Sequence, residues 1–155
     1  MKKLLLTILL ATIVNADSFS ITGLAFSKHK DTNFNEKHNW LGFKYKFKES
    51  EHYDIYIEGA DFKNSFGDDT KFLVAGAAYY PIVLEDFKMG ITLNAGYQRG
   101  YCIDGYQPTS CKVDSKNKSL FALPSFIVKY DRVSVSFLKI PTVTVARLEL
   151  ELFKW

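Results

Sequence analysis

The sequence predicts an all-β fold, an eight-stranded antiparallel barrel that crosses a membrane, and three observations support this. Apolar and polar residues alternate with a period of two through most of the chain, as they do along strands with two unlike faces. The connections between these segments tend to alternate between short and long, and Tyr, Phe and a terminal Trp gather near segment ends. Strands of about ten residues with short turns on one side, long loops on the other and aromatic girdles are typical of outer-membrane barrels.

The first sixteen residues, MKKLLLTILLATIVNA, are predicted to be a secretory signal peptide that is cleaved after Ala16. Two lysines precede an apolar run from Leu4 to Val14, and a small residue occupies the cleavage position. This run is too short to cross a bilayer as a mature helix. A buried N-terminal helix is the less favoured alternative. We therefore expect residues 17–155 to form one outer-membrane β-barrel domain.

The charge balance gives no support for a nucleic-acid partner, and none is expected. Removing the signal peptide lowers the number of Lys and Arg residues by two, from 20 to 18, against 17 Asp and Glu residues. A nearly neutral domain gives no indication of nucleic-acid binding. The expected location is the outer membrane of a Gram-negative bacterium, where the protein is expected to be a monomer.

Two segments show the alternation most clearly. In NWLGFKYKFKE the aromatic and aliphatic residues share one face and three lysines share the other, and FKMGITLNAGYQRGY divides in the same way. A soluble sandwich or lipocalin would show the same alternation, and the connection lengths favour the membrane barrel. The same count along the chain predicts eight strands, near 18–30, 38–49, 53–66, 70–82, 87–101, 119–131, 133–141 and 143–155.

The last strand contains one irregularity. Leu148, Leu150 and Leu152 lie on the face opposite Phe153 and Trp155 if the strand is regular. A β-bulge near Phe153 would bring all the apolar residues to the outer face.

Cys102 and Cys111, nine positions apart in a polar segment, are predicted to form a disulfide that staples a long loop, since exported proteins meet oxidising conditions. The segment between them contains no histidine, so a metal site is not expected.

An eight-stranded barrel has room inside for side chains or one slim ligand. The lysines of the second strand are expected to pair with Asp54 and Glu58 of the third and to close the periplasmic half of the lumen. The outer half is expected to be apolar and to admit a hydrocarbon chain. The residues assigned to this acyl pocket are Phe62, Leu73, Ala75, Gly96, Phe121 and Leu123. The register of the fourth strand leaves two choices for its inner face, Ala75 with Ala77 or Gly76 with Ala78.

Four short segments, in order, resemble one known family. FNEKHNWLGF is similar to the Y-N-E-R-P-W-G-G-G-F stretch of the lipid A palmitoyltransferase (PagP) family, and FKNSF is similar to its F-K-D-S-W. EDFKMGITLNAG resembles the family's E-N-F-H-L-G-L-G-F-T-A-G. PSFIVKYDRVSVSFLKIP resembles its P-L-A-S-V-G-Y segment and the following Y-I-P. Together these segments cover roughly residues 34–141.

The resemblance implies an enzyme that takes an acyl chain from a phospholipid and transfers it to lipid A of lipopolysaccharide, with no metal and no cofactor. It also implies catalytic roles for Ser65, at the serine of the motif, for Asn64, where the family has aspartate, and for His29 as the base. A loop serine that bonds its own turn and an exposed strand-end histidine are the structural alternatives. His38 is a weaker candidate for the base, and His52 is expected at the periplasmic end.

Two prolines match positions that flank a lateral lipid entrance in the same family. Pro124 and Pro141 are therefore assigned to a lateral lipid gate. Proline has no N–H to give to a β-ladder, which weakens strand pairing independently of any family.

Two functions follow from these observations. One is acyl transfer from phospholipid to lipid A. The other is a non-catalytic small barrel whose outer loops serve adhesion, surface masking or membrane stability, and Asn64 in place of aspartate favours this second function.

Overall fold

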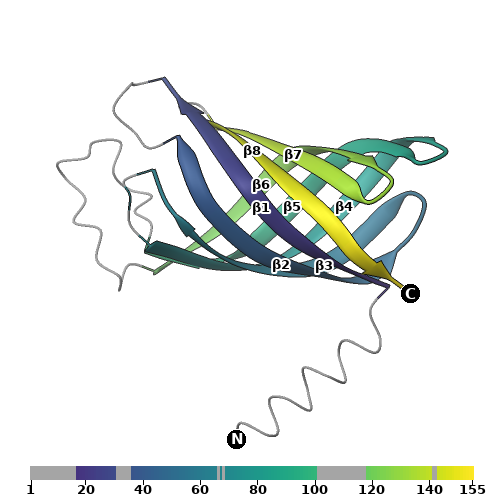
Figure 1. Cartoon of the computed structure of the whole chain (residues 1–155), viewed down its shortest axis with the longest axis horizontal. Coiled ribbons are helices and arrows are strands. Elements are labelled where there is room, and N and C mark those ends of the chain that lie inside the picture. The colour runs from purple at the N-terminus through teal and green to yellow at the C-terminus, as the bar shows by residue number, and fades with distance from the viewer. Residues whose placement is uncertain (1–16, 31–35, 66, 68, 101–117, 141–142) are drawn as a thin grey trace, which may run out of the picture.

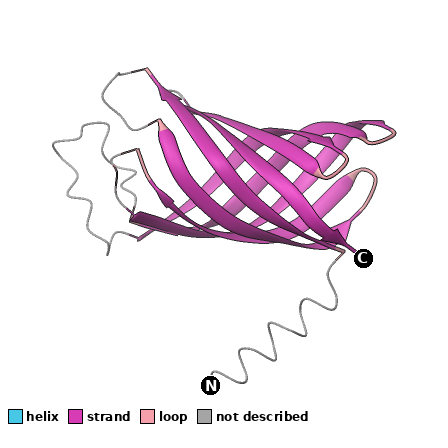
Figure 2. Cartoon of the chain, viewed as in Figure 1, coloured by secondary structure: helices cyan, strands magenta, loops and turns pink. Residues whose placement is uncertain are grey.

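The computed structural model describes residues 17–30, 36–65, 67, 69–100, 118–140 and 143–155. Eight antiparallel strands close into one barrel, in which each strand pairs with its neighbours in sequence and β1 pairs with β8 (Figures 1 and 2). The predicted fold class is therefore confirmed. The strands are β1 Ser18–His29, β2 Lys37–Glu49, β3 Tyr53–Lys63, β4 Asp69–Leu84, β5 Phe87–Arg99, β6 Lys118–Tyr130, β7 Val133–Ile140 and β8 Val143–Lys154.

These bounds agree with the sequence-based ranges to within three residues at every end. No described segment forms a helix that is long and apolar enough to span a membrane. The predicted signal peptide and both cysteines, Cys102 and Cys111, lie outside the described residues.

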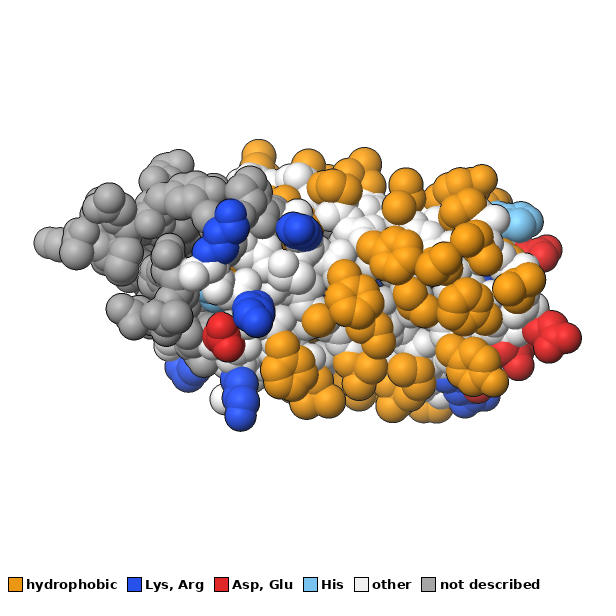
Figure 3. Space-filling view, turned by 90° about the horizontal axis from the view of Figure 1, so that it is seen from above, with side chains coloured by type: hydrophobic (Ala, Val, Ile, Leu, Met, Phe, Trp, Pro, Cys, Tyr) orange, Lys and Arg blue, Asp and Glu red, His pale blue; other side chains and the backbone are white. Residues whose placement is uncertain are grey.

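The outer surface of the barrel is apolar. Figure 3 shows a broad zone of hydrophobic side chains over the strands, with lysine and arginine at one end and most of the visible acidic groups at the other. Leu73, Ile91 and Leu93 are each more than half exposed, at 59, 60 and 58%. So large an apolar surface needs an apolar environment, and a closed barrel with such a surface is suited to lipid because all its strands are paired around the ring.

The two ends of the barrel differ. The connections between β2 and β3, β4 and β5, and β6 and β7 contain only two or three residues, and the start of β1 pairs with the end of β8 at this same end. Two of the connections at the other end are long, residues 30–36 and 100–117. Short turns lie on the periplasmic side of outer-membrane barrels and long loops on the outer side. We refer to these as the periplasmic end and the outer end.

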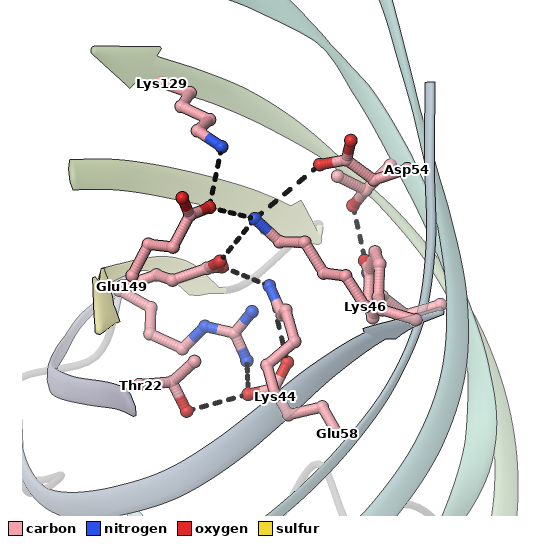
Figure 4. A network of polar contacts seen from close by, with 12 residues as sticks. Thr22, Lys44, Lys46, Asp54, Glu58, Lys129 and Glu149 are labelled. Carbon is pink, nitrogen blue, oxygen red and sulfur yellow. Dashed lines mark hydrogen bonds and ion pairs between the residues drawn. The ribbon is translucent and has the colours of Figure 1, made fainter. Parts of the chain in front are cut away.

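Buried ion pairs fill the periplasmic half of the lumen. Lys44 and Lys46 point inward from β2, as predicted, and lie 3.7 and 3.8 Å from Glu58 and Asp54 respectively (Figure 4). The third lysine, Lys48, was expected on the same face but is exposed, because the register of β2 with β3 shifts between Lys46 and Lys48. The closer partners come from β8, because Lys44 also bonds Glu149 and Lys46 lies 3.2 Å from its carboxylate.

The same network continues toward the periplasmic end. Lys129 of β6 lies 2.8 Å from Glu49 and 2.9 Å from Glu151, and Lys46 lies 3.2 Å from Glu151. Arg147 of β8 donates to Glu58 over 2.6 Å. The sequence predicted the β2–β3 pairs and missed the contributions of β6 and β8, since which strands face one another across the lumen follows only from closure.

The inner face of β4 corrects part of the predicted acyl pocket. Leu73 and Ala75 face outward, so their assignment to the lumen is wrong, and the inner residues are Phe72, Val74, Gly76 and Ala78. The strand alternates strictly here, and the pairing of β3 with β4 is unbroken from Tyr53 to Lys63. The choice that the sequence left open is thus decided in favour of Gly76 with Ala78.

The remaining residues of that set lie on the inner face. Gly96 is the cross-strand partner of buried Val74 and of Phe121, so these three share a face. Leu123 pairs with Asn94, which points inward to Tyr56, and Phe62 pairs with fully buried Thr70.

Two of the irregularities in strand pairing bear directly on the predictions and on the outer end. On β8 the pairing with β1 passes from Phe153 directly to Glu151, so the predicted bulge near Phe153 is confirmed and both Phe153 and Leu150 are exposed. The second irregularity, in β1 between Gly23 and Ala25, was not predicted. Leu24, at φ 47°, projects outward with 63% of its surface exposed.

Candidate functional site

A serine and a histidine that lie far apart in sequence meet at the outer end of the barrel. His29 is the last residue of β1, and Ser65 follows the end of β3 by two residues. Ser65 Oγ and His29 Nε2 are 2.9 Å apart and hydrogen-bonded. Ser65 is buried and His29 half-buried. A hydroxyl at this distance from an imidazole nitrogen has the geometry of a nucleophile or acid beside its base.

The β1 bulge explains why His29 points inward. Before it, the buried side chains are at even positions, among them Ser20 and Thr22; after it, they are at odd positions, including Ala25 and Ser27. In a regular strand Ser27 and His29 would share the outward face with Phe19, because a shift of one residue exchanges the two faces. The bulge therefore brings His29 to Ser65.

A second histidine joins the pair through Ser27. Ser27 Oγ lies 3.1 Å from His29 Nε2 and 2.8 Å from Nε2 of His38, near the start of β2. His38 Nδ1 lies 2.7 Å from the backbone carbonyl of Lys63. This carbonyl can only accept, so Nδ1 of His38 donates. Ser65, His29, Ser27 and His38 thus form one hydrogen-bonded chain, which we call the rim chain.

Three of the four residues of the rim chain were predicted from the sequence. Ser65 and His29 were candidates for catalysis, and His38 was placed at the outer end as a weaker candidate for the base. No sequence motif pointed to Ser27, because its inward orientation depends on the bulge at Leu24.

Asn64 has a structural role at this site. Its side chain is fully buried, and Nδ2 donates to Thr70 Oγ1 over 3.2 Å and to the Gly100 carbonyl over 3.0 Å. Thr70 donates to the same carbonyl over 3.1 Å. These bonds tie the segment that contains Ser65 to the neighbouring strands. A carboxylate could not replace the amide here, because ionised aspartate only accepts hydrogen bonds.

Aromatic rings lie in the lumen below the rim chain. The Trp40 and Phe62 rings stack with centroids 4.4 Å apart, and Phe72 lies 4.8 Å from Trp40. The Phe62 ring also meets the His38 ring edge to face at 6.3 Å. Trp40 donates its indole N–H to Thr22 Oγ1 over 3.1 Å, which fixes it in the lumen. An apolar layer therefore separates the rim chain from the ion pairs.

The strand pairing is incomplete on one side of the barrel. β6 pairs with β7 only from Phe126 to Tyr130, whereas its pairing with β5 runs from Lys118 to Tyr130. Within the described residues, the outer half of β6 therefore has no ladder with β7. Pro124 is exposed and lies two residues beyond the last β6–β7 pair. Pro141 lies outside the described residues.

Exposed ion pairs surround the outer end. Lys63 bonds Asp69 over 2.8 Å, and Lys71 lies 3.2 Å from Asp61. The described residues include no cluster of three or more potential metal ligands.

The closed ring of eight strands, the apolar exterior and the unequal ends define a small outer-membrane β-barrel protein. No protein-family model matches the chain, and no curated protein matches it. Among solved structures it is similar to the crystal structure of Ail, the attachment invasion locus protein of Yersinia pestis. The identity is 14% and the TM-score 0.44, over 86% of this chain and 93% of that one. It is also similar to the backbone structure of Ail from Yersinia pestis in a phospholipid bilayer nanodisc, at 12% identity and TM-score 0.42, over 88% and 99%.

Proposed function

We propose that the protein is an outer-membrane acyltransferase that moves an acyl chain from a phospholipid to lipid A. The hydrogen bond of 2.9 Å between Ser65 and His29 is the observation that carries the proposal. The resemblance of FKNSF and its neighbouring segments to the lipid A palmitoyltransferase family implied both residues. Their contact adds geometric support, because acyl transfer needs a base within reach of a hydroxyl.

In this reaction His29 Nε2 takes a proton from a hydroxyl that attacks the acyl ester. Either Ser65 itself is the attacking group, or it orients the hydroxyl of lipid A. The acyl chain would enter the outer half of the lumen, beside Phe62, Phe121 and Leu123. Within the described residues, the outer half of β6 near Pro124 pairs with β5 and not with β7, and this side of the strand offers a lateral route for a lipid. Proline favours such an opening because it cannot donate to a ladder.

The second candidate is a non-catalytic barrel whose outer loops serve adhesion, surface masking or membrane stability. Asn64 favours it, since its amide anchors Thr70 and Gly100 and supplies no negative charge. The outer-membrane barrel itself is common to both candidates and does not separate them.

Mass spectrometry of lipid A separates the two. A host without lipid A palmitoyltransferase would express the wild type, Ser65→Ala, and Ser20→Ala as a matched control from the inner face near the other end of the barrel. We expect an additional acylated species from the wild type and from Ser20→Ala, and a loss of about 100-fold or more in Ser65→Ala.

The mass increment reports the length of the transferred chain. Heat-dependent migration in gels establishes that each variant is folded. A folded wild-type barrel that leaves lipid A unchanged would refute the proposal and favour the second candidate.

A further inference from the structure

The rim chain contains more than a serine and its base. Two histidines share one hydroxyl, since Ser27 Oγ bonds Nε2 of His29 at 3.1 Å and Nε2 of His38 at 2.8 Å. The chain ends on the Lys63 carbonyl, which holds a proton on His38 Nδ1. A neutral His38 therefore presents only an acceptor at Nε2, and the Ser27 hydroxyl must donate to it.

This arrangement constrains His29. Because the single proton of Ser27 is directed to His38, Ser27 Oγ is left as an acceptor toward His29. Before the reaction His29 Nε2 must carry no proton, so it accepts from the Ser65 hydroxyl at 2.9 Å. Once Nε2 has taken that proton, Ser27 Oγ at 3.1 Å accepts the new N–H and stabilises protonated His29.

We propose that Ser27 and His38 act as positioning residues that draw a proton from His29 after His29 has taken it from Ser65. This inference rests on the proposed function for its reaction, whereas the proton sharing itself depends only on the rim chain. It gives the site a neutral second proton acceptor, whereas the resemblance implies a carboxylate at position 64. Asn64 cannot fill that role because it has no charge and is bonded to Thr70 and Gly100.

In the proposed transfer, each proton leaves one named atom and is taken up by another. As Ser65 Oγ attacks the acyl carbonyl carbon, its O–H bond breaks, an N–H bond forms at His29 Nε2, and the carbonyl oxygen takes the negative charge. The His29 N–H then breaks as a new O–H forms on Ser27, while the original Ser27 O–H breaks and an N–H forms on His38 Nε2. His29 is neutral again and His38 is a cation whose Nδ1–H still bonds the Lys63 carbonyl. When the oxyanion collapses to a carbonyl, the ester C–O bond breaks and the proton returns through Ser27 and His29 to the leaving oxygen of the phospholipid. A lipid A hydroxyl then displaces Ser65 from the acyl carbon by the same steps in reverse.

The surroundings of the two rings contain both signs of charge. Lys28 and Lys37 belong to the same strands as the histidines. Lys63 and Asp69, from β3 and β4, bond each other over 2.8 Å. From β8, Arg147 stacks on Trp40 at 5.2 Å and is paired with Glu58. The Phe62 ring covers one edge of His38.

Nitrogen NMR of the imidazole rings tests the proton sharing without any substrate. Barrel labelled with ¹⁵N-histidine in phospholipid bicelles would be titrated as wild type, Ser27→Ala and Ser27→Thr. His52, which bonds the Tyr80 carbonyl over 3.1 Å at the periplasmic end, is the internal control. We expect Ser27→Ala to lower the titration midpoint of His29 by about one pH unit, because no Ser27 oxygen then accepts the N–H of protonated His29. Ser27→Thr should restore the midpoint of His29, and the midpoint of His52 should be the same in all three proteins.

Ser27 is buried, so Ser27→Cys replaces Ser27→Ala if the alanine variant does not fold, because a thiol is a weak donor of similar size. A His29 titration that is the same in the wild type and in the folded variant would overturn the proposal.

Turnover supplies the second readout. We expect His38→Phe to displace the pH profile of kcat for lipid A acylation while KM is unchanged, and identical profiles would overturn the positioning role. If the wild type shows no turnover but His29 and His38 titrate together, the proton sharing stands and the proposed function fails. The two failures are therefore distinguishable.

Discussion

At the scale of single residues, Asn64 has a structural role at the outer end of the barrel. Asn64 occupies a position where the family that the sequence resembles has aspartate, and the structure bonds it to Thr70 and Gly100. Its two N–H groups meet two acceptors in a fully buried place. The amide at position 64 is thus matched to its neighbours by hydrogen bonding.

Changing Asn64 to aspartate should therefore destabilise the barrel. Asn64→Asp removes both donors and buries a charge against the Gly100 carbonyl, which should lower the free energy of unfolding by about 1–3 kcal/mol. Urea unfolding in lipid vesicles measures this, with Asn39→Asp, an exposed amide on β2, as the control for added charge. Equal stability of the two variants would contradict the role assigned to Asn64.

Gly76 is a second residue whose identity has a clear steric reason. A Cβ at this position would lie 2.4 Å from the Tyr56 ring, whose hydroxyl donates to Asn94 over 2.7 Å. Gly76→Ala must displace that ring, and we expect a loss of about 1–3 kcal/mol. In Gly59→Ala the nearest atom would be 3.8 Å away, so this variant should unfold at the wild-type urea concentration.

At the scale of the strands, two departures from regular pairing shape the site. The β1 bulge at Leu24 exchanges the faces of the strand, so that Ser27 and His29 turn inward. Among the described strands, the short ladder between β6 and β7 leaves the outer half of β6 paired with β5 alone. Both irregularities lie where a lipid or a reacting group would have to approach.

Hydrogen exchange should detect the incomplete β6 ladder. Amides in the outer half of β6 that face away from β5 should exchange at least about tenfold faster than those between Phe126 and Tyr130, because no β7 ladder protects them. NMR in bicelles resolves each amide, and β5, paired on both sides along its length, is the internal reference. Uniform protection along β6 would argue against a lateral opening there.

At the scale of the whole molecule, the lumen consists of three layers. Ion pairs occupy the periplasmic half, the rings of Trp40, Phe62 and Phe72 lie above them, and the rim chain lies at the outer end. Acidic groups come from β2, β3 and β8, and basic groups from β2, β6 and β8. The ion pairs thus join strands on opposite sides of the barrel.

Removing one buried cation should unbalance this network. Lys46 lies 3.2 Å from both Glu149 and Glu151, so Lys46→Met leaves buried carboxylates without their shared partner. We expect a loss of about 3–5 kcal/mol in the free energy of unfolding. Lys48→Met, an exposed lysine on the same strand, is the matched control in the same urea titration. A similar small effect in both would show that the network adds little to stability.

The sequence by itself determined the number and the bounds of the strands, because alternation and connection length are local properties. For the same reason it determined the apolar exterior and the bulge near Phe153. It also identified Ser65, through the resemblance of FKNSF to a known motif, and His29, as the candidate for the base that the same resemblance implies. The assignment of Leu73 and Ala75 to the lumen was wrong, since in a strand of small apolar residues both registers look alike.

Only the tertiary structure decided how these parts meet. The pairing of Lys44 and Lys46 with Glu149 and Glu151 depends on ring closure, which brings together residues 105 positions apart. The rim chain depends on the bulge at Leu24. Leucine is not a residue type that indicates a bulge, so this irregularity could not be predicted from the sequence. Side-chain facing in a barrel is set by the register with both neighbours, and a single strand does not contain that information.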